Sequence, residues 1–232
     1  NENIVKTTEP PETLRTIAEA QHINMYDCFT GFNWIANVMR ENEGKARYLG
    51  GGEESYGFLS EDFVRDKDSV SAISLMAEIA AWAKDKGLNM TDMLIDIYMK
   101  YGFSREKGIS LVRKGKSGAE EIIALMKQFR ENPPKEIAGS PVVTVKDFQS
   151  LVETNVATGE TKKLDMPATS NVLQYYTADR TKVSVRPSGT EPKIKFYIEV
   201  HDTLASADEY KATEARADEK INRIAKEFGI TK

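Results

Sequence analysis

The sequence predicts an α/β protein: a mixed α/β sandwich domain followed by an α+β domain whose antiparallel sheet is flanked by helices. Two observations lead to this prediction. Up to Gly102, apolar segments with strand spacing and helix spacing alternate, as they do in α/β layer structures. After Gly102, several strand-like segments follow one another between helical segments, which favours an antiparallel sheet. We therefore expect one domain over residues 1–102, a second over 103–232, and a hinge near Gly102.

The first half is interpreted as strands alternating with helices. A short strand at Ile4–Thr8 is followed by Pro10-Pro11, and proline suits the first turn of a helix. Residues Val70–Lys84 form an amphipathic helical pattern whose apolar face carries Ile73, Met76, Ala77, Ala80 and Ala81. The other elements expected are a helix through Leu14, Ile17 and Ala18, a strand at His22–Tyr26, a helix at Phe32–Arg40, a brief strand at Tyr48–Leu49 and a helix capped by Thr91.

The second half is interpreted as strands in series flanked by two helices. A strand at Ile109–Val112 precedes a helix that opens on a capping box, Ser117–Glu120, and ends at Asn132-Pro133-Pro134. A second capping box, Ser206–Glu209, predicts the start of a long charged C-terminal helix. The strands expected between these helices are Val142–Phe148, Val172–Tyr176, Lys182–Arg186 and Ile194–Val200.

Composition excludes several classes of partner. The net charge of −4 argues against a general nucleic-acid surface, which would carry a basic stripe. No apolar run approaches the ~20 residues that span a bilayer, so we expect no membrane partner. Cys28 is the only cysteine, which excludes an intrachain disulfide and fits a cytoplasmic location. Cys28 is interpreted as a small buried thiol, with a nucleophilic role as the alternative.

The turn between the last two predicted strands has the chemistry that a phosphate monoester needs. Apolar and polar residues alternate over 182–186 and again over 194–200, which predicts a hairpin. The turn offers a guanidinium, hydroxyls and backbone N–H groups, from Arg186, Ser188, Gly189 and Thr190. Arginine binds phosphate bidentately, and hydroxyls and turn amides can complete the site. The alternative is an ordinary polar hairpin turn, because turns favour the same residues.

Three motifs carry a resemblance to a known family. The run Arg186–Lys193, Arg-Pro-Ser-Gly-Thr-Glu-Pro-Lys, resembles the phosphate-binding loop of the α-D-phosphohexomutases, the family of phosphoglucomutase and phosphomannomutase. Gly51–Gly57, Gly-Gly-Glu-Glu-Ser-Tyr-Gly, resembles that family's sugar-binding loop, and Arg65–Asp68 resembles the charged segment that follows it. The motifs occur in the family's order. The resemblance covers essentially the whole chain and implies the family's third and fourth domains.

Two further motifs of the family are absent from this sequence. The family's first domain carries a Ser-His loop whose serine is phosphorylated, and the second carries an Asp-Gly-Asp-x-Asp-Arg loop that holds magnesium. Neither pattern occurs here, and the only histidines are His22 and His201. We therefore expect a C-terminal fragment of an intramolecular phosphotransferase. Its missing N-terminal domains would be partners, Mg2+ would bind in the full-length enzyme only, and the fragment would be inactive by itself.

The resemblance implies roles for particular residues. Glu53 and Ser55 would hydrogen-bond hydroxyls of a hexose ring, and the alternative is a glycine-rich turn with solvated carboxylates. Arg65 would contact phosphate, and Lys67 would assist proton transfer or neutralise phosphoryl oxygens. A salt-bridged run on a solvated surface is the alternative for this pair.

Thr30 and Gly31 occupy the position of a family loop that contacts the sugar. Many relatives have lysine or histidine at the position of Asn33, so a charged contact is missing here. Trp34 lies one helical turn from Val38 and is interpreted as a core residue rather than a residue that stacks on sugar.

The resemblance also implies a reaction and its substrates. A phosphoserine would donate to a hexose monophosphate, giving a bisphosphate whose other phosphate returns to the serine. The substrates implied are glucose 1-phosphate, glucose 6-phosphate and mannose phosphates. Two alternatives remain: a non-catalytic sugar-phosphate-binding module, and a phosphoglucosamine mutase, whose sugar loop typically has Gln-Ser-Gly-His where this chain has Glu54–Gly57.

Overall fold

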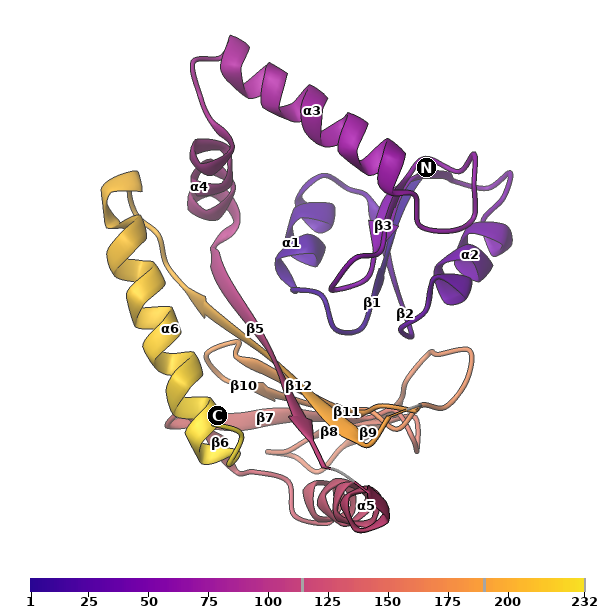
Figure 1. Cartoon of the computed structure of the whole chain (residues 1–232), viewed down its shortest axis with the longest axis vertical. Helices are drawn as coiled ribbons and strands as arrows, with labels where there is room; N and C mark the ends of the chain where they lie inside the picture. Colours follow the sequence, from indigo (N-terminus) through magenta and orange to yellow (C-terminus); the bar gives the residue numbers. More distant parts are fainter. Residues whose placement is uncertain (114, 190, 232) are drawn as a thin grey trace. The chain divides into compact units, whose positions relative to one another are not determined.

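The computed structural model describes residues 1–113, 115–189 and 191–231 and divides the chain into two compact units (Figure 1). The first unit contains Asn1–Gly102 and Leu204–Asp208. The second contains Phe103–Thr203 and Glu209–Lys232. Each unit has its own sheet and its own buried core, and together they have the fold class expected from the sequence.

The first unit is an α/β layer structure on a four-stranded sheet in the order β2-β1-β3-β4. The central strand β1 pairs in parallel with β2 and β3, and β4 pairs antiparallel with β3. The helices α1 and α2 connect the parallel strands and lie on opposite sides of the sheet (Figure 1). The elements are β1 (Glu2–Thr7), α1 (Thr13–Ala20), β2 (Asn24–Cys28), α2 (Phe32–Glu41), β3 (Arg47–Gly52), β4 (Phe58–Ser60), α3 (Ser69–Asp85) and α4 (Met90–Tyr101).

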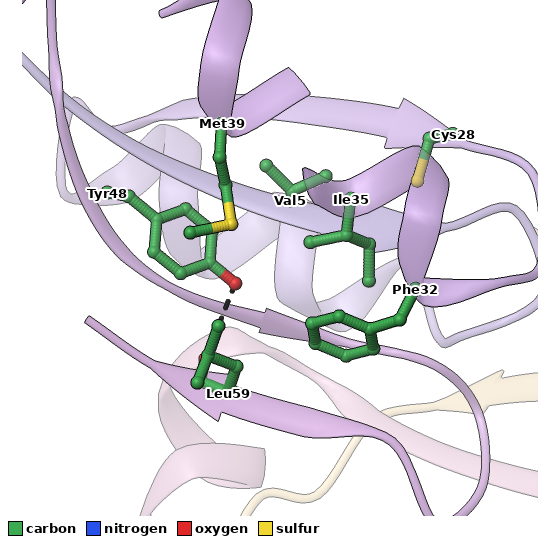
Figure 2. Packing of buried hydrophobic residues seen from close by; sticks show 7 residues of the cluster. All are labelled: Val5, Cys28, Phe32, Ile35, Met39, Tyr48 and Leu59. Carbon is green, nitrogen blue, oxygen red and sulfur yellow. Dashed lines mark hydrogen bonds between the residues drawn. The ribbon is translucent and has the colours of Figure 1, made fainter. Parts of the chain in front are cut away.

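The core of this unit lies between the sheet and α2 (Figure 2). Helix α2 contributes three apolar side chains spaced by three or four residues, which places them on one helical face. The Tyr48 hydroxyl donates a hydrogen bond to the Leu59 carbonyl at 3.4 Å, so the buried phenol keeps a partner. The cluster consists of Val5, Cys28, Phe32, Ile35, Met39, Tyr48 and Leu59.

The second unit is an antiparallel sheet in the order β5-β12-β11-β10-β7-β8-β9, with β6 paired to β7. Strands β5 and β12 pair continuously from Phe103↔Asp202 to Val112↔Lys193. The elements are β5 (Phe103–Val112), α5 (Gly115–Glu131), β6 (Glu136–Ile137), β7 (Ser140–Asp147), β8 (Val152–Asn155), β9 (Thr161–Lys163), β10 (Leu173–Thr177), β11 (Lys182–Pro187), β12 (Lys193–Asp202), a 3-10 helix (Ala207–Glu209) and α6 (Tyr210–Glu227).

The two faces of the second sheet differ in polarity because side chains alternate along each strand. One face packs against the helices: the Phe196 ring lies 6.0 Å from Phe129 of α5 and 6.1 Å from Phe228, which follows α6. The opposite face is polar, and its members on the three adjacent strands are Gln174, Tyr176, Lys182, Ser184, Arg186, Lys195, Tyr197 and Glu199.

Three predicted helix caps are wrong. Helix α4 is capped by Asn89 rather than Thr91, because the Asn89 side chain accepts hydrogen bonds from the N–H groups of Thr91 and Asp92. Ser117 lies inside α5, which begins at Gly115. The capping box at Ser206–Glu209 does not form either, because a 3-10 helix precedes α6 and Glu209 makes no side-chain cap.

The expected apolar face of α3 is also placed differently. Ile73 is 70% exposed and Met76 is 52% exposed, so this face does not pack in the core of the unit. Ala83, near the end of the helix, is its buried residue instead. The strand expected at His22–Tyr26 begins later, at Asn24, because His22 adopts a positive φ of 58° directly after α1.

Candidate functional site

The loop Glu53–Gly57 joins β3 to β4 and is closed by a hydrogen bond from the Glu53 N–H to the Gly57 carbonyl at 2.8 Å. The strand before it requires glycine at two positions. A Cβ atom at Gly51 would lie 2.1 Å from the Val5 carbonyl oxygen, and one at Gly52 would lie 2.4 Å from the Gly57 carbonyl oxygen. The local glycines therefore permit a close approach of backbones that sets the position of the loop.

The Glu53 carboxylate is mostly buried, with 13% of its side chain exposed. Its Oε1 atom lies 3.8 Å from Lys67 Nζ, and that ammonium lies 5.8 Å from the centre of the Phe32 ring. The pair brings a mostly buried hydrogen-bond acceptor and a cation, whose side chain is 52% exposed, to one place. The carboxylate can accept a hydrogen bond from a hydroxyl group, and the ammonium can bind an anionic oxygen.

A pocket of about 1090 Å³ contains this loop. Ser55 lies on its rim, exposed, with its hydroxyl 3.5 Å from Glu54 Oε1. Besides the loop, the pocket is lined by Lys67 and Asp68 and by an apolar wall of Leu14, Ala72, Ile73 and Met76. Three sequence-predicted residues therefore meet here: Glu53, Ser55 and Lys67.

Lys6 also lines this pocket and was not predicted from the sequence. Its side chain is buried and its ammonium forms ion pairs with Asp27 at 2.9 Å and Glu12 at 3.3 Å. The available signal was a lysine near the carboxyl end of a parallel strand, where ligand sites gather. Because two carboxylates already hold the ammonium, its evident role is to join β1, β2 and α1.

Thr30 and Gly31 lie at the start of α2 and are not among the residues that line the pocket. Gly31 adopts a φ of 120°, and its carbonyl accepts the Trp34 N–H at 2.9 Å. The Thr30 hydroxyl is buried and has no hydrogen-bond partner within the described residues. Trp34 packs edge-on against Phe29, with ring centres 5.8 Å apart, as a core-packing role requires.

Arg65 also lies outside the pocket lining. Its guanidinium pairs with Glu43 at 2.8 Å on the surface. The amino end of α3 is occupied by Asp68, whose carboxylate accepts the N–H groups of Val70 and Ser71. The hydrogen bond with the Ser71 side chain lowers the pKa of Asp68 below its ordinary value. The chain's own carboxylate thus uses the donors that an external anion would need.

The second motif forms the connection from β11 to β12. The Ser188 N–H donates to the Lys193 carbonyl at 2.8 Å, and the Arg113 N–H donates to the Pro192 carbonyl at 2.9 Å. These bonds brace the turn from within the hairpin and from the end of β5. Gly189 is exposed, and a Cβ atom there would meet nothing within 4 Å. Thr190 lies outside the described residues.

A pocket of about 520 Å³ adjoins this turn, lined by Arg186, Ser188 and Gly189 together with Asn171, Ile122 and Ile123. Glu191 also lines it, but its carboxylate pairs with Lys193. Hydrogen bonding to Lys193 lowers the pKa of Glu191 below its ordinary value. Arginine and serine are residue types that bind phosphate, and both contribute to the lining of this pocket.

Cys28 is buried, and burial raises the pKa of its thiol to about 12. A thiol in that state is not a nucleophile at neutral pH, so the buried-thiol interpretation is favoured. Within the described part of the chain, no group of three or more His, Cys, Asp or Glu residues is arranged to hold a metal ion. None of the described helices combines the length and apolar composition that crossing a bilayer requires.

Comparison with protein families matches both halves of the chain. The model for phosphoglucomutase/phosphomannomutase alpha/beta/alpha domain III matches residues 1–101. The model for the phosphoglucomutase/phosphomannomutase C-terminal domain matches residues 125–217.

Among curated proteins, the chain is similar to bacterial phosphoglucomutases. It is 35% identical to that of Staphylococcus epidermidis over 184 residues, which is 79% of this chain and 33% of the relative. It is 32% identical to that of Staphylococcus haemolyticus over 198 residues, which is 85% of this chain and 36% of the relative. The chain thus spans about a third of the length of these relatives.

Among solved structures, the fold is similar to pp63/parafusin, a phosphoglucomutase from Paramecium in its open form. The TM-score is 0.57 at 14% identity, with 96% of this chain and 38% of that chain covered. A phosphoglucomutase/phosphomannomutase family protein from Burkholderia thailandensis gives a TM-score of 0.50 at 17% identity, with 99% and 38% covered.

Proposed function

This chain belongs to the phosphoglucomutase/phosphomannomutase family, and we propose that it supplies the hexose- and phosphate-binding part of a phosphohexomutase. The observation that carries the proposal is the loop at Glu53. Glycines fix its position, its carboxylate is mostly buried beside Lys67, and it lines a pocket large enough for a hexose phosphate.

Glu53 would accept hydrogen bonds from two adjacent hydroxyls of the ring, and Ser55 would donate to or accept from a third. A buried carboxylate discriminates strongly, because a ligand that lacks the hydroxyls leaves it unpaired. The Thr30 hydroxyl, which has no hydrogen-bond partner among the residues that the structure describes, is a further candidate for a sugar contact. Lys67, held near Glu53, would carry a proton or neutralise a phosphoryl oxygen.

The turn after β11 would hold the phosphate that does not react. Arg186 supplies bidentate donors, Ser188 and Thr190 supply hydroxyls, and Gly189 leaves room for the ligand. Arg65 could join only by leaving its ion pair with Glu43. The substrates proposed are glucose 1-phosphate, glucose 6-phosphate and the corresponding mannose phosphates.

The proposed reaction interconverts hexose 1-phosphate and hexose 6-phosphate through a bisphosphate, in the cytoplasm. A phosphoserine donates to the free hydroxyl, and the other phosphate returns to that serine. Magnesium supplies electrostatic stabilisation in such transfers. The described residues of this chain offer no cluster of ligands for it, so no step is assigned to a metal here. We propose that both the serine and the metal loop belong to domains outside this sequence.

The proposal is tested by titrating the purified chain calorimetrically with glucose 1-phosphate and with glucose, and by assaying mutase activity with Mg2+. We expect binding of glucose 1-phosphate, much weaker binding of glucose, and no conversion to glucose 6-phosphate. Magnesium-dependent conversion by this chain would overturn the proposed division of labour. A failure to bind glucose 1-phosphate would overturn the binding role.

A further inference from the structure

We propose that Tyr197 is a positioning residue that holds the Arg186 guanidinium ready for phosphate. The proposal rests on the proposed function and concerns the same turn. Arg186 Nη2 donates a hydrogen bond to Tyr197 Oη at 3.2 Å. Tyr197 lies opposite Ser184 and Arg186 lies opposite Lys195, so the two side chains are diagonal neighbours on the polar face of the sheet. Diagonal pairs are within reach of long and aromatic side chains.

Tyr197 is a rigid support. It belongs to β12, which pairs with β5 on one side and with β11 on the other. Its chain neighbours Phe196 and Ile198 are fully buried on the helix-covered face. A tyrosine has only two side-chain torsions, whereas an arginine loses much rotamer freedom when it is fixed. Fixing the guanidinium before the ligand arrives reduces the entropy that binding costs.

The chemistry of the contact suits an anion site. A guanidinium has five N–H donors, and the bond to the Tyr197 phenol uses one of them. A phenol is uncharged, so this contact leaves the positive charge of the arginine in place. Lys195 Nζ lies 5.8 Å from the centre of the Tyr197 ring and adds to the local positive charge.

The test compares Tyr197→Phe with Tyr176→Phe, which removes a phenol on the same polar face that donates to Gln174 at 2.9 Å. Inorganic phosphate is titrated into each purified chain, and the Nε–Hε signal of Arg186 is followed by NMR. We expect Tyr197→Phe to weaken phosphate binding about threefold to tenfold and to increase the motion of that signal. Tyr176→Phe should change neither, and both variants should melt close to the parent chain.

Arg186→Ala and the double variant complete the cycle. With Arg186 removed, Tyr197→Phe should cost no further affinity, because a positioning residue acts through the residue it positions. The positioning role is wrong if Tyr197→Phe binds like the parent, or if it costs the same affinity without Arg186. If Arg186→Ala bound phosphate as tightly as the parent chain does, the proposed phosphate role of the turn would itself be wrong.

Discussion

At the scale of single residues, backbone distances explain why glycines precede the loop Glu53–Gly57. Gly50, Gly51 and Gly52 are consecutive in β3 but differ in the space around them. The nearest atom to a Cβ at Gly50 would be the Leu59 carbonyl oxygen at 3.4 Å, whereas at Gly51 the Val5 carbonyl oxygen would be only 2.1 Å away. The pairing of β3 with β1 therefore requires glycine at position 51, whereas position 50 tolerates a methyl group.

This difference predicts unequal effects of two equivalent substitutions. Gly51→Ala should destabilise the fold by about 1–3 kcal/mol, because β1 and β3 must separate to accommodate the methyl group. At roughly 2–4 °C per kcal/mol, thermal melting can resolve the loss. Gly50→Ala is the control and should melt within about 1 °C of the parent. Equal melting temperatures for the two variants would show that the close approach does not hold in solution.

The sequence predicts some site residues better than others. Glu53 and Ser55 stand in a recognisable motif, and the structure brings them to one pocket with Lys67. Tyr197 could not be found this way, because its contact with Arg186 depends on the register between β11 and β12. Lys6 was missed for a similar reason, because its carboxylate partners are Glu12, which directly precedes α1, and Asp27 of β2.

At the scale of elements, strand and helix types follow from periodicity, but their ends do not. Helix α3 occupies Ser69–Asp85, close to the expected Val70–Lys84, because its apolar spacing is regular. Strand β5 runs from Phe103 rather than from Ile109. Its first half is polar and becomes a strand only by pairing with β12, which local sequence cannot reveal.

The connection from β10 to β11 illustrates how a turn and a helix are joined by charge. The Asp179 carboxylate accepts hydrogen bonds from the hydroxyls of Thr177 and Thr181 at 2.6 Å and 2.9 Å. Lys220 of α6 contacts the same carboxylate at 2.6 Å. Burial tends to raise the pKa of Asp179, but Lys220 and the two hydroxyls outweigh it and hold the pKa well below its ordinary value.

This shift gives a prediction with a definite sign. Because the pKa is lower in the folded state than the value of about 3.9 in unfolded chains, the interaction stabilises the fold at neutral pH. The contribution is lost as pH falls below about 4 and through the folded-state pKa. Asp179→Asn should therefore lower stability to urea at pH 7, by about 0.5–1 kcal/mol since the carboxylate is partly exposed.

The difference between Asp179→Asn and the parent should narrow when the same unfolding experiment is run at pH 3. Asp165→Asn, at an exposed position, serves as the control and should show no comparable pH dependence. A difference that stays constant between pH 7 and pH 3 would contradict the assigned role of the Asp179 carboxylate.

At the scale of the whole molecule, each unit carries one of the two loops that are proposed to bind the substrate. The fold class follows from the sequence because strand–helix alternation and strands in series are visible along the whole chain. The short strands β4, β6, β8 and β9 were not predicted, because they have two to four residues and are stabilised by their neighbours. The exposure of Ile73 likewise depends on where α3 lies, which its amphipathic pattern alone does not specify.

We propose that the Glu53 loop recognises the sugar and that the Arg186 turn recognises phosphate. Calorimetric titration of the parent chain, Glu53→Gln and Arg186→Ala with glucose 1-phosphate and with inorganic phosphate separates these roles. Glu53→Gln should weaken glucose 1-phosphate binding about tenfold and leave inorganic phosphate unchanged, while Arg186→Ala should weaken both by about tenfold to a hundredfold. If Glu53→Gln bound glucose 1-phosphate as tightly as the parent chain does, Glu53 would not be a sugar ligand. If Glu53→Gln lost the same affinity for inorganic phosphate as for glucose 1-phosphate, the separate roles of the loop and the turn would be contradicted.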